Sequence, residues 1–271
     1  MNQAARMTEA SGVQRPLIEV RDLNKIYASN DGKGVVALKS VGFSIREGEF
    51  ISIVGRSGCG KSTLIKILAG LLTHTSGEVT IEGRPVSGPG PDVGIVFQAP
   101  VLLPWRTIME NVLLPSQIRG TITPAVKEHA LKLLALVGLE GFDKRYPYEL
   151  SGGMQQRAAI VRALVHDPRL LLMDEPFGAL DAMTREQMNV EVLRIWAASK
   201  KTVIFVTHSI VESVFLSDRV FVMTPRPGRL AEIIDVDLPR PRTLEMINSD
   251  RFGVFTNRIR KLLDAEGDIS G

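Results

Sequence analysis

Short runs of apolar and β-branched residues recur along the chain and predict buried strands. Residues 50–54 (FISIV) form such a run directly after the polar pair Gly48-Glu49, and residues 203–207 (VIFVT) form another. Short, continuous runs of this kind are typical of strands that are buried on both faces. The other segments with a strand pattern are residues 17–27, 78–82, 93–97, 170–173 and 220–223.

Helical spacing of apolar residues marks several of the remaining segments. Residues 61–72 are expected to form a helix whose inner side carries Leu64, Ile65, Leu68 and Leu71. Residues 127–137 and 183–199 also show helical patterns. From about residue 107 to residue 166 strand signals are scarce, so a helical block is expected to interrupt an α/β body.

The composition describes a folded protein with a mixed surface. The chain has 271 residues, of which 44% are hydrophobic and 23% charged, enough for one large domain or two small ones. The 33 basic and 30 acidic residues leave a net charge of only +3, so no nucleic-acid partner is expected. The single cysteine excludes an intrachain disulfide.

No segment of the sequence indicates secretion or membrane insertion. Residues 1–16 lack the apolar stretch of a signal peptide and are expected to form a flexible polar tail. No run approaches the ~18 consecutive apolar residues of a membrane-spanning helix. A role at a membrane would therefore require another chain to cross the bilayer.

Residues 55–63 read GRSGCGKST and match the phosphate-loop pattern. Glycines let backbone N–H groups turn toward phosphate oxygens, and the helix that begins near Gly60 adds its positive end. Lys61 is expected to reach the β- and γ-phosphates, and Ser62 to bind Mg²⁺. The preceding strand and the following helix disfavour a glycine turn without function. The expected nucleotide-binding residues of this loop are Gly55, Arg56, Ser57, Gly58, Cys59, Gly60, Lys61, Ser62 and Thr63.

Cys59 lies at the start of this helix, two residues before Lys61. A helix N-terminus and a neighbouring lysine both lower the pKa of a thiol, so a lowered pKa is expected here. We nevertheless interpret Cys59 as a residue that fills space and not as a catalyst.

Two acids follow an apolar strand and suggest a metal ligand and a catalytic base. Asp174 ends the run at residues 170–173, and Glu175 comes directly after it. Beside a phosphate loop, the first acid is expected to hold Mg²⁺ and the second to orient or deprotonate the attacking water. Without a phosphate loop, the same pair could equally be a solvated strand end.

Gln98 and His208 also follow predicted strands. Sites of α/β proteins form at the carboxyl ends of parallel strands, so both side chains are expected to belong to the catalytic group. The amide of Gln98 can bind Mg²⁺ and contact the water, and Gln98 also joins the helical block. A lone histidine is more often structural, but the position of His208 favours a function.

A second glycine-rich sequence, Ser151-Gly152-Gly153, precedes a helical run. Its hydroxyl and amide groups would form another anion site at a helix start. One chain needs only one phosphate loop, so this site implies a γ-phosphate that a partner presents. Symmetric pairing of two identical chains would place two ATP molecules between them.

Together, these sequences resemble the motifs of the ABC transporter ATPase family over residues 17–238. In order along the chain, the matching motifs are GRSGCGKST, Gln98, LSGGMQQR, LLLMDEP, Ala179-Leu180-Asp181 and His208. The resemblance implies an α/β fold: a RecA-like P-loop NTPase core with an N-terminal antiparallel β subdomain and an inserted α-helical subdomain. Core residues would be 17–98 and 167–238, and the helical subdomain 99–166.

The resemblance also implies roles for individual residues. ATP would lie between the phosphate loop of one copy and Ser151 and Gly153 of a second copy, arranged head to tail. Tyr27 would stack on adenine, the alternative being a tyrosine of the core. Asp181 would lie at the dimer seam near the partner's phosphate loop. Glu175 would be the catalytic base, and His208 would hold both this base and the γ-phosphate.

Three longer segments resemble the ATPases of nitrate, sulfonate and taurine importers: VFQAPVLLPWRTIMENV, LLLMDEPFGALDAMTR and TPRPGRL. Such subunits lie on the cytoplasmic face of the cell membrane, where they pair with a permease and indirectly with a solute-binding protein. Trp105 and Arg106 would receive the permease's coupling helix, the alternative for Trp105 being a core position. The cargo stays open, because it contacts other chains.

Residues 239–271 are expected to form a C-terminal helical extension with Phe252, Phe255, Ile259 and Leu262 on one face. Docking on the body is the favoured interpretation of this face, and a subunit or regulatory contact is the alternative.

Three other functions remain to be weighed against import. A non-transport ABC ATPase of DNA repair or translation usually carries a coiled-coil insertion, zinc cysteines or two cassettes, and this sequence shows none of them. A nucleotide-dependent switch without turnover would not need Glu175. The ATPase of an exporter or a lipid-handling permease is disfavoured by the residues around Trp105.

Overall fold

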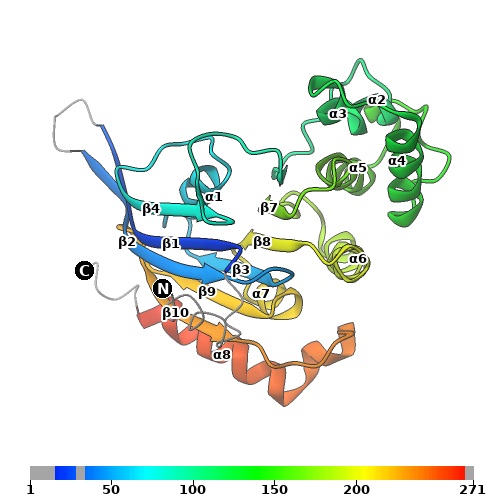
Figure 1. The fold of residues 1–271 in the computed structure, drawn as a ribbon. Helices are drawn as coiled ribbons and strands as arrows, with labels where there is room; N and C mark the ends of the chain where they lie inside the picture. The colour runs from blue at the N-terminus through cyan, green and yellow to red at the C-terminus, as the bar shows by residue number, and fades with distance from the viewer. Residues whose placement is uncertain (1–15, 29–33, 266–271) are drawn as a thin grey trace, which may run out of the picture.

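The computed structural model describes residues 16–28 and 34–265. Residues 1–15 of the predicted tail (residues 1–16) and residues 266–271 of the predicted C-terminal extension therefore lie outside the described part. Two sheets form the body (Figure 1). A four-stranded antiparallel sheet has the order β2-β1-β4-β5. Its strands are β1 (Ile18–Tyr27), β2 (Val35–Ile45), β4 (Ser76–Ile81) and β5 (Arg84–Pro85).

The second sheet has six strands in the order β10-β9-β3-β8-β7-β6. All its neighbours pair in parallel except β10 and β9, which are antiparallel. Its strands are β3 (Phe50–Gly55), β6 (Val93–Val96), β7 (Leu170–Asp174), β8 (Thr202–Thr207), β9 (Arg219–Met223) and β10 (Leu230–Asp235). Every residue of β3 and β8 is buried, which explains their continuous apolar sequences.

The helical block lies between β6 and β7 in the chain and to one side of the sheets (Figure 1, green), with α5 packed against β6. Its α-helices are α2 (Ile108–Val112), α3 (Leu114–Ile118), α4 (Pro124–Leu136) and α5 (Gly152–Leu164). The remaining α-helices are α1 (Lys61–Leu68), α6 (Ala182–Ser199), α7 (Ile210–Leu216) and α8 (Asp250–Ala265), with short 3₁₀ turns at Pro147–Glu149 and Leu244–Asn248. No described helix is long and apolar enough to span a bilayer.

The prediction for residues 61–72 was wrong at its end. Helix α1 stops at Leu68, and Leu71 is 51% exposed instead of facing the core. Gly70 adopts a left-handed conformation at φ +69°, the usual way to end a helix. A side chain there would also collide with the backbone of Gly88, so the chain must turn at this glycine.

The C-terminal extension docks on the body, as its favoured interpretation predicts. Helix α8 buries Phe252, Phe255 and Ile259, and Leu262 packs against the same hydrophobic core. Arg240 reinforces this attachment, because its guanidinium donates to Asp218 Oδ1 at 2.7 Å and lies 4.2 Å from the ring centre of Trp196.

Candidate nucleotide site

The phosphate loop connects the buried strand β3 to helix α1 and depends on its glycines. Gly58 and Gly60 have φ values of +76° and +102°, which only glycine adopts without strain. A Cβ atom on Gly60 would also lie 2.7 Å from Leu38 Cδ2 and 3.0 Å from the carbonyl oxygen of Ala37. The loop therefore turns tightly against β2 and leaves its backbone amides at the start of α1.

A cavity of about 230 Å³ opens over this loop. The predicted residues that line it are Tyr27, Ser57, Gly58, Gly60, Lys61, Ser62, Thr63 and Glu175. Lys61 is nearly buried, and its Nζ donates to the carbonyl oxygen of Gly55 at 2.9 Å and lies 3.8 Å from Glu175 Oε1. A lysine held in this way is a fixed positive charge at the floor of the cavity.

Tyr27 lies at the rim of this cavity, at the end of β1. Its side chain is 39% exposed, and its hydroxyl is 3.2 Å from Thr63 Oγ1. The alternative of a core tyrosine is therefore wrong. An exposed ring at the cavity rim is available for stacking on a planar base.

Glu175 follows β7 and is brought to His208, which follows β8. His208 Nδ1 is 3.2 Å from Glu175 Oε2, and the backbone N–H of Glu175 donates to Val206 at 2.9 Å. Glu175 has a φ of +46°, an uncommon value for a residue other than glycine. Strained backbone of this kind costs on the order of 1–3 kcal/mol and clusters at functional sites.

Asp174 and Ser62 form a pair of oxygen ligands next to the lysine. Ser62 Oγ donates to Asp174 Oδ1 at 3.2 Å. Burial raises the pKa of the Asp174 carboxyl, and the bond from Ser62 offsets part of that rise. A hydroxyl and a carboxylate are donors that suit Mg²⁺, which retains several waters and takes few protein ligands. These residues therefore fit the ion, although no group of three acidic, histidine or cysteine side chains in the described ranges could hold a metal.

Asp174→Asn is expected to raise the melting temperature of the metal-free chain at neutral pH. Because the folded-state pKa is raised above the ordinary 3.8, folding disfavours the ionised carboxylate. The destabilisation is therefore present above the folded-state pKa and disappears as the pH falls to 3.8. Thermal unfolding in a chelator at several pH values measures it, with the exposed Asp235→Asn as control. An Asn variant that melts below the native chain at neutral pH contradicts this expectation.

Gln98 follows β6 but lies exposed, beside the turn after Glu175. A Cβ atom on Gly178 would be 3.1 Å from Gln98 Nε2. A buried neighbour, Gln156, donates to the carbonyl oxygen of Phe97 at 3.2 Å and ties α5 to this junction. Gln98 thus lies between the helical block and the loop that carries Glu175.

Ser151, Gly152, Gly153 and Asp181 lie outside this cavity and form a second group. Ser151 caps α5 by accepting from the N–H of Met154 at 3.4 Å. Asp181 caps α6 by accepting from the N–H of Thr184 at 3.0 Å. A Cβ atom on Gly153 would lie 2.9 Å from Thr184 Cγ2, so the two helix starts touch. The predicted site residues therefore fall into two separate predicted half-sites, one around Lys61 and one around Ser151.

The expectation for the Cys59 pKa was wrong. Cys59 is fully buried, and burial raises the pKa of its thiol more than Lys61 lowers it. A Cβ atom on Gly55 would lie 2.7 Å from Cys59 Sγ, so the thiol packs directly beneath the loop. This position agrees with a residue that fills space.

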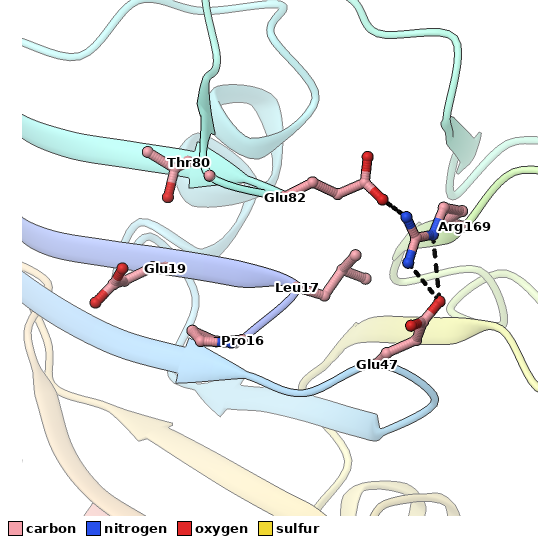
Figure 2. Close-up of a pocket in the computed structure, with 8 residues that line it drawn as sticks. Pro16, Leu17, Glu19, Glu47, Thr80, Glu82 and Arg169 are labelled. Atoms are coloured by element: carbon pink, nitrogen blue, oxygen red, sulfur yellow. Dashed lines mark hydrogen bonds and ion pairs between the residues drawn. The ribbon is translucent and has the colours of Figure 1, made fainter. Parts of the chain in front are cut away.

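A larger cavity, of about 460 Å³, lies at the other end of the β subdomain (Figure 2). Glu19, Glu47 and Glu82 line it, and its arginine, Arg169, is paired with both Glu47 and Glu82. Acids outnumber cations in this lining, and its one arginine is already paired, so the cavity does not favour a polyphosphate. The cavity over the phosphate loop is therefore the better nucleotide site, despite its smaller size.

Sequence reasoning missed three residues that line the nucleotide cavity, which are Val35, Ala37 and Arg226. The first two lie on β2, a strand that the apolar pattern did not reveal, and Arg226 lies in the turn between β9 and β10. The segment TPRPGRL contains Arg226, but its sequence indicates only a resemblance to importer ATPases and no contact with a nucleotide.

Trp105 and Ile118 are exposed apolar residues of the helical block. They are 71% and 78% exposed, so a core position for Trp105 is wrong. Their neighbours Arg106 and Gln117 are joined by a hydrogen bond of 2.5 Å, which holds the two segments side by side. Exposed large apolar side chains on segments that are held side by side mark a candidate contact surface.

Comparisons with known proteins identify the family. A family model described as ABC transporter matches residues 38–178. The taurine import ATP-binding protein of Rhizobium johnstonii is 44% identical over 93% of this chain and 98% of its own length. The nitrate import ATP-binding protein of Synechocystis is 41% identical over 91% and 94%. A dimeric ATP-binding cassette in a post-hydrolysis state, bound to ADP and Pi, superposes with a TM-score of 0.71 at 34% identity, covering 82% of this chain and 100% of that one.

A phosphate loop on a parallel sheet defines a P-loop nucleoside triphosphatase when acids follow a nearby parallel strand, as Asp174 and Glu175 do at the end of β7, the strand next but one to β3. Within that class, the inserted helical block, in which Ser151 caps α5, is typical of ATP-binding cassettes. The chain belongs to the ABC transporter family and is an ATPase of that family.

Proposed function

We propose that two copies of this chain bind two ATP molecules head to tail and hydrolyse them to drive solute import through a separate permease. The observation that carries the dimer is the separation of the two half-sites within one chain. Ser151 and Asp181 do not line the cavity around Lys61, so a second copy is needed to supply them. The similar cassette bound to ADP and Pi is dimeric, which supports pairing of two copies.

In the proposed site, the phosphate loop would bind the triphosphate, and Ser62, Asp174 and Gln98 would hold Mg²⁺. When bound, the ion neutralises negative charge on the phosphates. Glu175 accepts a proton from the attacking water, and its contact with His208 fixes the carboxylate in place. The positive charge of Lys61 balances the negative charges of Glu175 and of the phosphates.

The permease is proposed to dock on the surface around Trp105 and Ile118. Trp is enriched at interface hot spots, and an unpartnered indole with this exposure suits a pocket or helix of a second protein. Attachment to the permease would place the chain on the cytoplasmic face of the membrane, with a solute-binding protein on the other side. The described helices of the block reach at most 13 residues, which argues against the coiled-coil insertion of repair ATPases.

Trp105→Ala is expected to release the chain from membranes without impairing its chemistry. Loss of a central aromatic anchor weakens an interface by roughly 2 kcal/mol or more, which corresponds to a drop in affinity of more than about tenfold. Membranes from cells that express tagged chains are washed, and the bound fraction is measured together with ATPase activity of the purified chain. Val254→Ala on α8, which is 65% exposed, is the control. Unchanged recovery of the Trp105 variant in membranes would contradict docking at this surface.

The cargo is proposed to be a small anion such as a sulfonate or nitrate. Support comes from the relatives named for taurine and nitrate import, which match almost the whole chain. Because this chain meets the permease and not the solute, uptake of labelled taurine and nitrate by cells that lack the chain is the direct test. Loss of uptake of one solute, restored by the native chain, identifies the cargo. Unchanged uptake of both argues against this solute class.

A further inference from the structure

Arg226 lies in the turn between β9 and β10 and borders the nucleotide cavity. Its Nε donates to the carbonyl oxygen of Gly58, in the phosphate loop, at 3.0 Å. A Cβ atom on Gly58 would lie 3.6 Å from Arg226 Nη2, so the guanidinium lies along the loop. The arginine therefore reaches the loop from a part of the chain that is distant in sequence.

The turn that carries Arg226 is fixed on both sides. The N–H of Gly228 donates to Ala37 at 3.0 Å, and the N–H of Lys39 donates to Gly228 at 3.0 Å. The hydroxyl of Thr224 donates to the carbonyl oxygen of Pro227 at 3.2 Å. The two backbone bonds attach the turn to β2, whose Val35 and Ala37 also line the cavity, and the Thr224 bond closes the turn itself. The backbone that carries Arg226 is therefore fixed in position by these bonds.

The charge of Arg226 is not neutralised within the described residues. Its guanidinium forms no ion pair there, whereas its one hydrogen bond uses Nε and leaves both Nη groups available. Two cations and one acid line the cavity, which are Lys61, Arg226 and Glu175. Lys61 lies 3.8 Å from that acid, so part of its charge is already balanced. A polyphosphate in the cavity calls for a further cation.

We propose that Arg226 is a second cationic ligand of the nucleotide's phosphate chain, in addition to Lys61. The planar guanidinium presents paired N–H donors that match phosphate oxygens. Its Nε anchors it to Gly58, and its Nη groups bind the phosphates. This assignment rests on the proposed ATP site and adds a residue to it. Two other roles are distinguishable by experiment: a brace that only shapes the loop, and a contact to the second copy.

The test compares three variants of the full chain in nucleotide titrations. Arg226→Ala removes both the charge and the bond to Gly58, whereas Arg226→Gln removes the charge but retains an N–H donor. Arg229→Ala removes the same charge from an exposed arginine three residues further on that does not line the cavity. Binding of ATP, ADP and AMP is measured at low protein concentration, and thermal unfolding checks that each variant folds.

Both Arg226 variants are expected to bind ATP and ADP about tenfold more weakly than the native chain, since a charge-assisted bidentate contact is lost. Their affinity for AMP, which lacks the β- and γ-phosphates, is expected to change less than about twofold. Arg229→Ala is expected to bind all three nucleotides with native affinity.

Several results would overturn the assignment. Native affinity in Arg226→Gln, with weak binding in Arg226→Ala, indicates a brace. Native affinity in both, with reduced hydrolysis, indicates a contact to the second copy. Equal losses for AMP and ATP, or an equal loss in Arg229→Ala, exclude a specific phosphate contact. If the native chain binds no ATP, the proposed function itself is refuted. If the native chain binds ATP and the Arg226 variants bind it equally well, only the role of Arg226 is refuted.

Discussion

Glu175→Gln reduces ATP hydrolysis by more than about 100-fold while ATP binding persists, because general-base catalysis contributes on the order of 10²–10⁴. The amide has nearly the shape of the carboxylate, so the cavity is retained. It cannot accept the proton of the attacking water, and the chain should therefore accumulate as a dimer with ATP bound. Phosphate release measures the loss, and size-exclusion chromatography with ATP and Mg²⁺ measures the dimer.

The matched control is Glu186→Gln, an exposed acid on α6 that makes no contact with the nucleotide cavity. It should retain hydrolysis within about twofold of the native rate, as surface substitutions usually do. Near-native turnover in Glu175→Gln would remove Glu175 from the role of base. Loss of ATP binding in the same variant would instead make it a residue that shapes the cavity.

Ser151→Asp is expected to abolish hydrolysis, by about 100-fold or more, because its carboxylate would face the partner's γ-phosphate where stabilising contacts are needed. Aspartate caps a helix as well as serine does, so α5 keeps its first turn. ATP binding to the dilute chain should stay within about twofold of native, since Ser151 does not line its own chain's cavity. Phosphate release and nucleotide titration give the two readouts.

The control for this substitution is Thr123→Asp. Thr123 caps α4 in the same way, by accepting from the N–H of Val126 at 3.2 Å. Thr123→Asp introduces the same negative charge at a helix start in the same helical block. Full hydrolysis in Ser151→Asp, or loss in both variants alike, would argue against a phosphate at the start of α5.

The sequence predicts the central strands well, because burial on both faces leaves continuous apolar runs such as β3 and β8. It fails for β2, where the alternation is broken: Ala37 and Leu38 are both buried, and Ser40 has a φ of +49°. Pairing of β1 with β2 contains register shifts, so the period of two holds only for residues 41–45 and not for the whole strand. The sequence pattern also fails to predict strand β10, because this strand lies at the edge of the sheet and only its Ile234 is buried.

Site residues were predictable where chemistry follows directly from local sequence. The phosphate loop, Asp174, Glu175 and His208 each end a strand or begin a helix, and parallel pairing brings them together. Arg226 and Ala37 reach the cavity only through the packing of a turn against β2, which no local pattern encodes. The same limit explains the error at Cys59, because burial depends on the whole fold.

The composite site is tested most directly by mixing the Glu175→Gln and Ser151→Asp chains before ATP is added. In a mixed dimer, one site contains both substitutions, and the other combines a native Glu175 with a native Ser151 from the other chain. Random pairing then restores about a quarter of the native hydrolysis rate from two inactive proteins, provided that one intact site suffices. A mixture as inactive as its components would contradict a catalytic site shared between two copies.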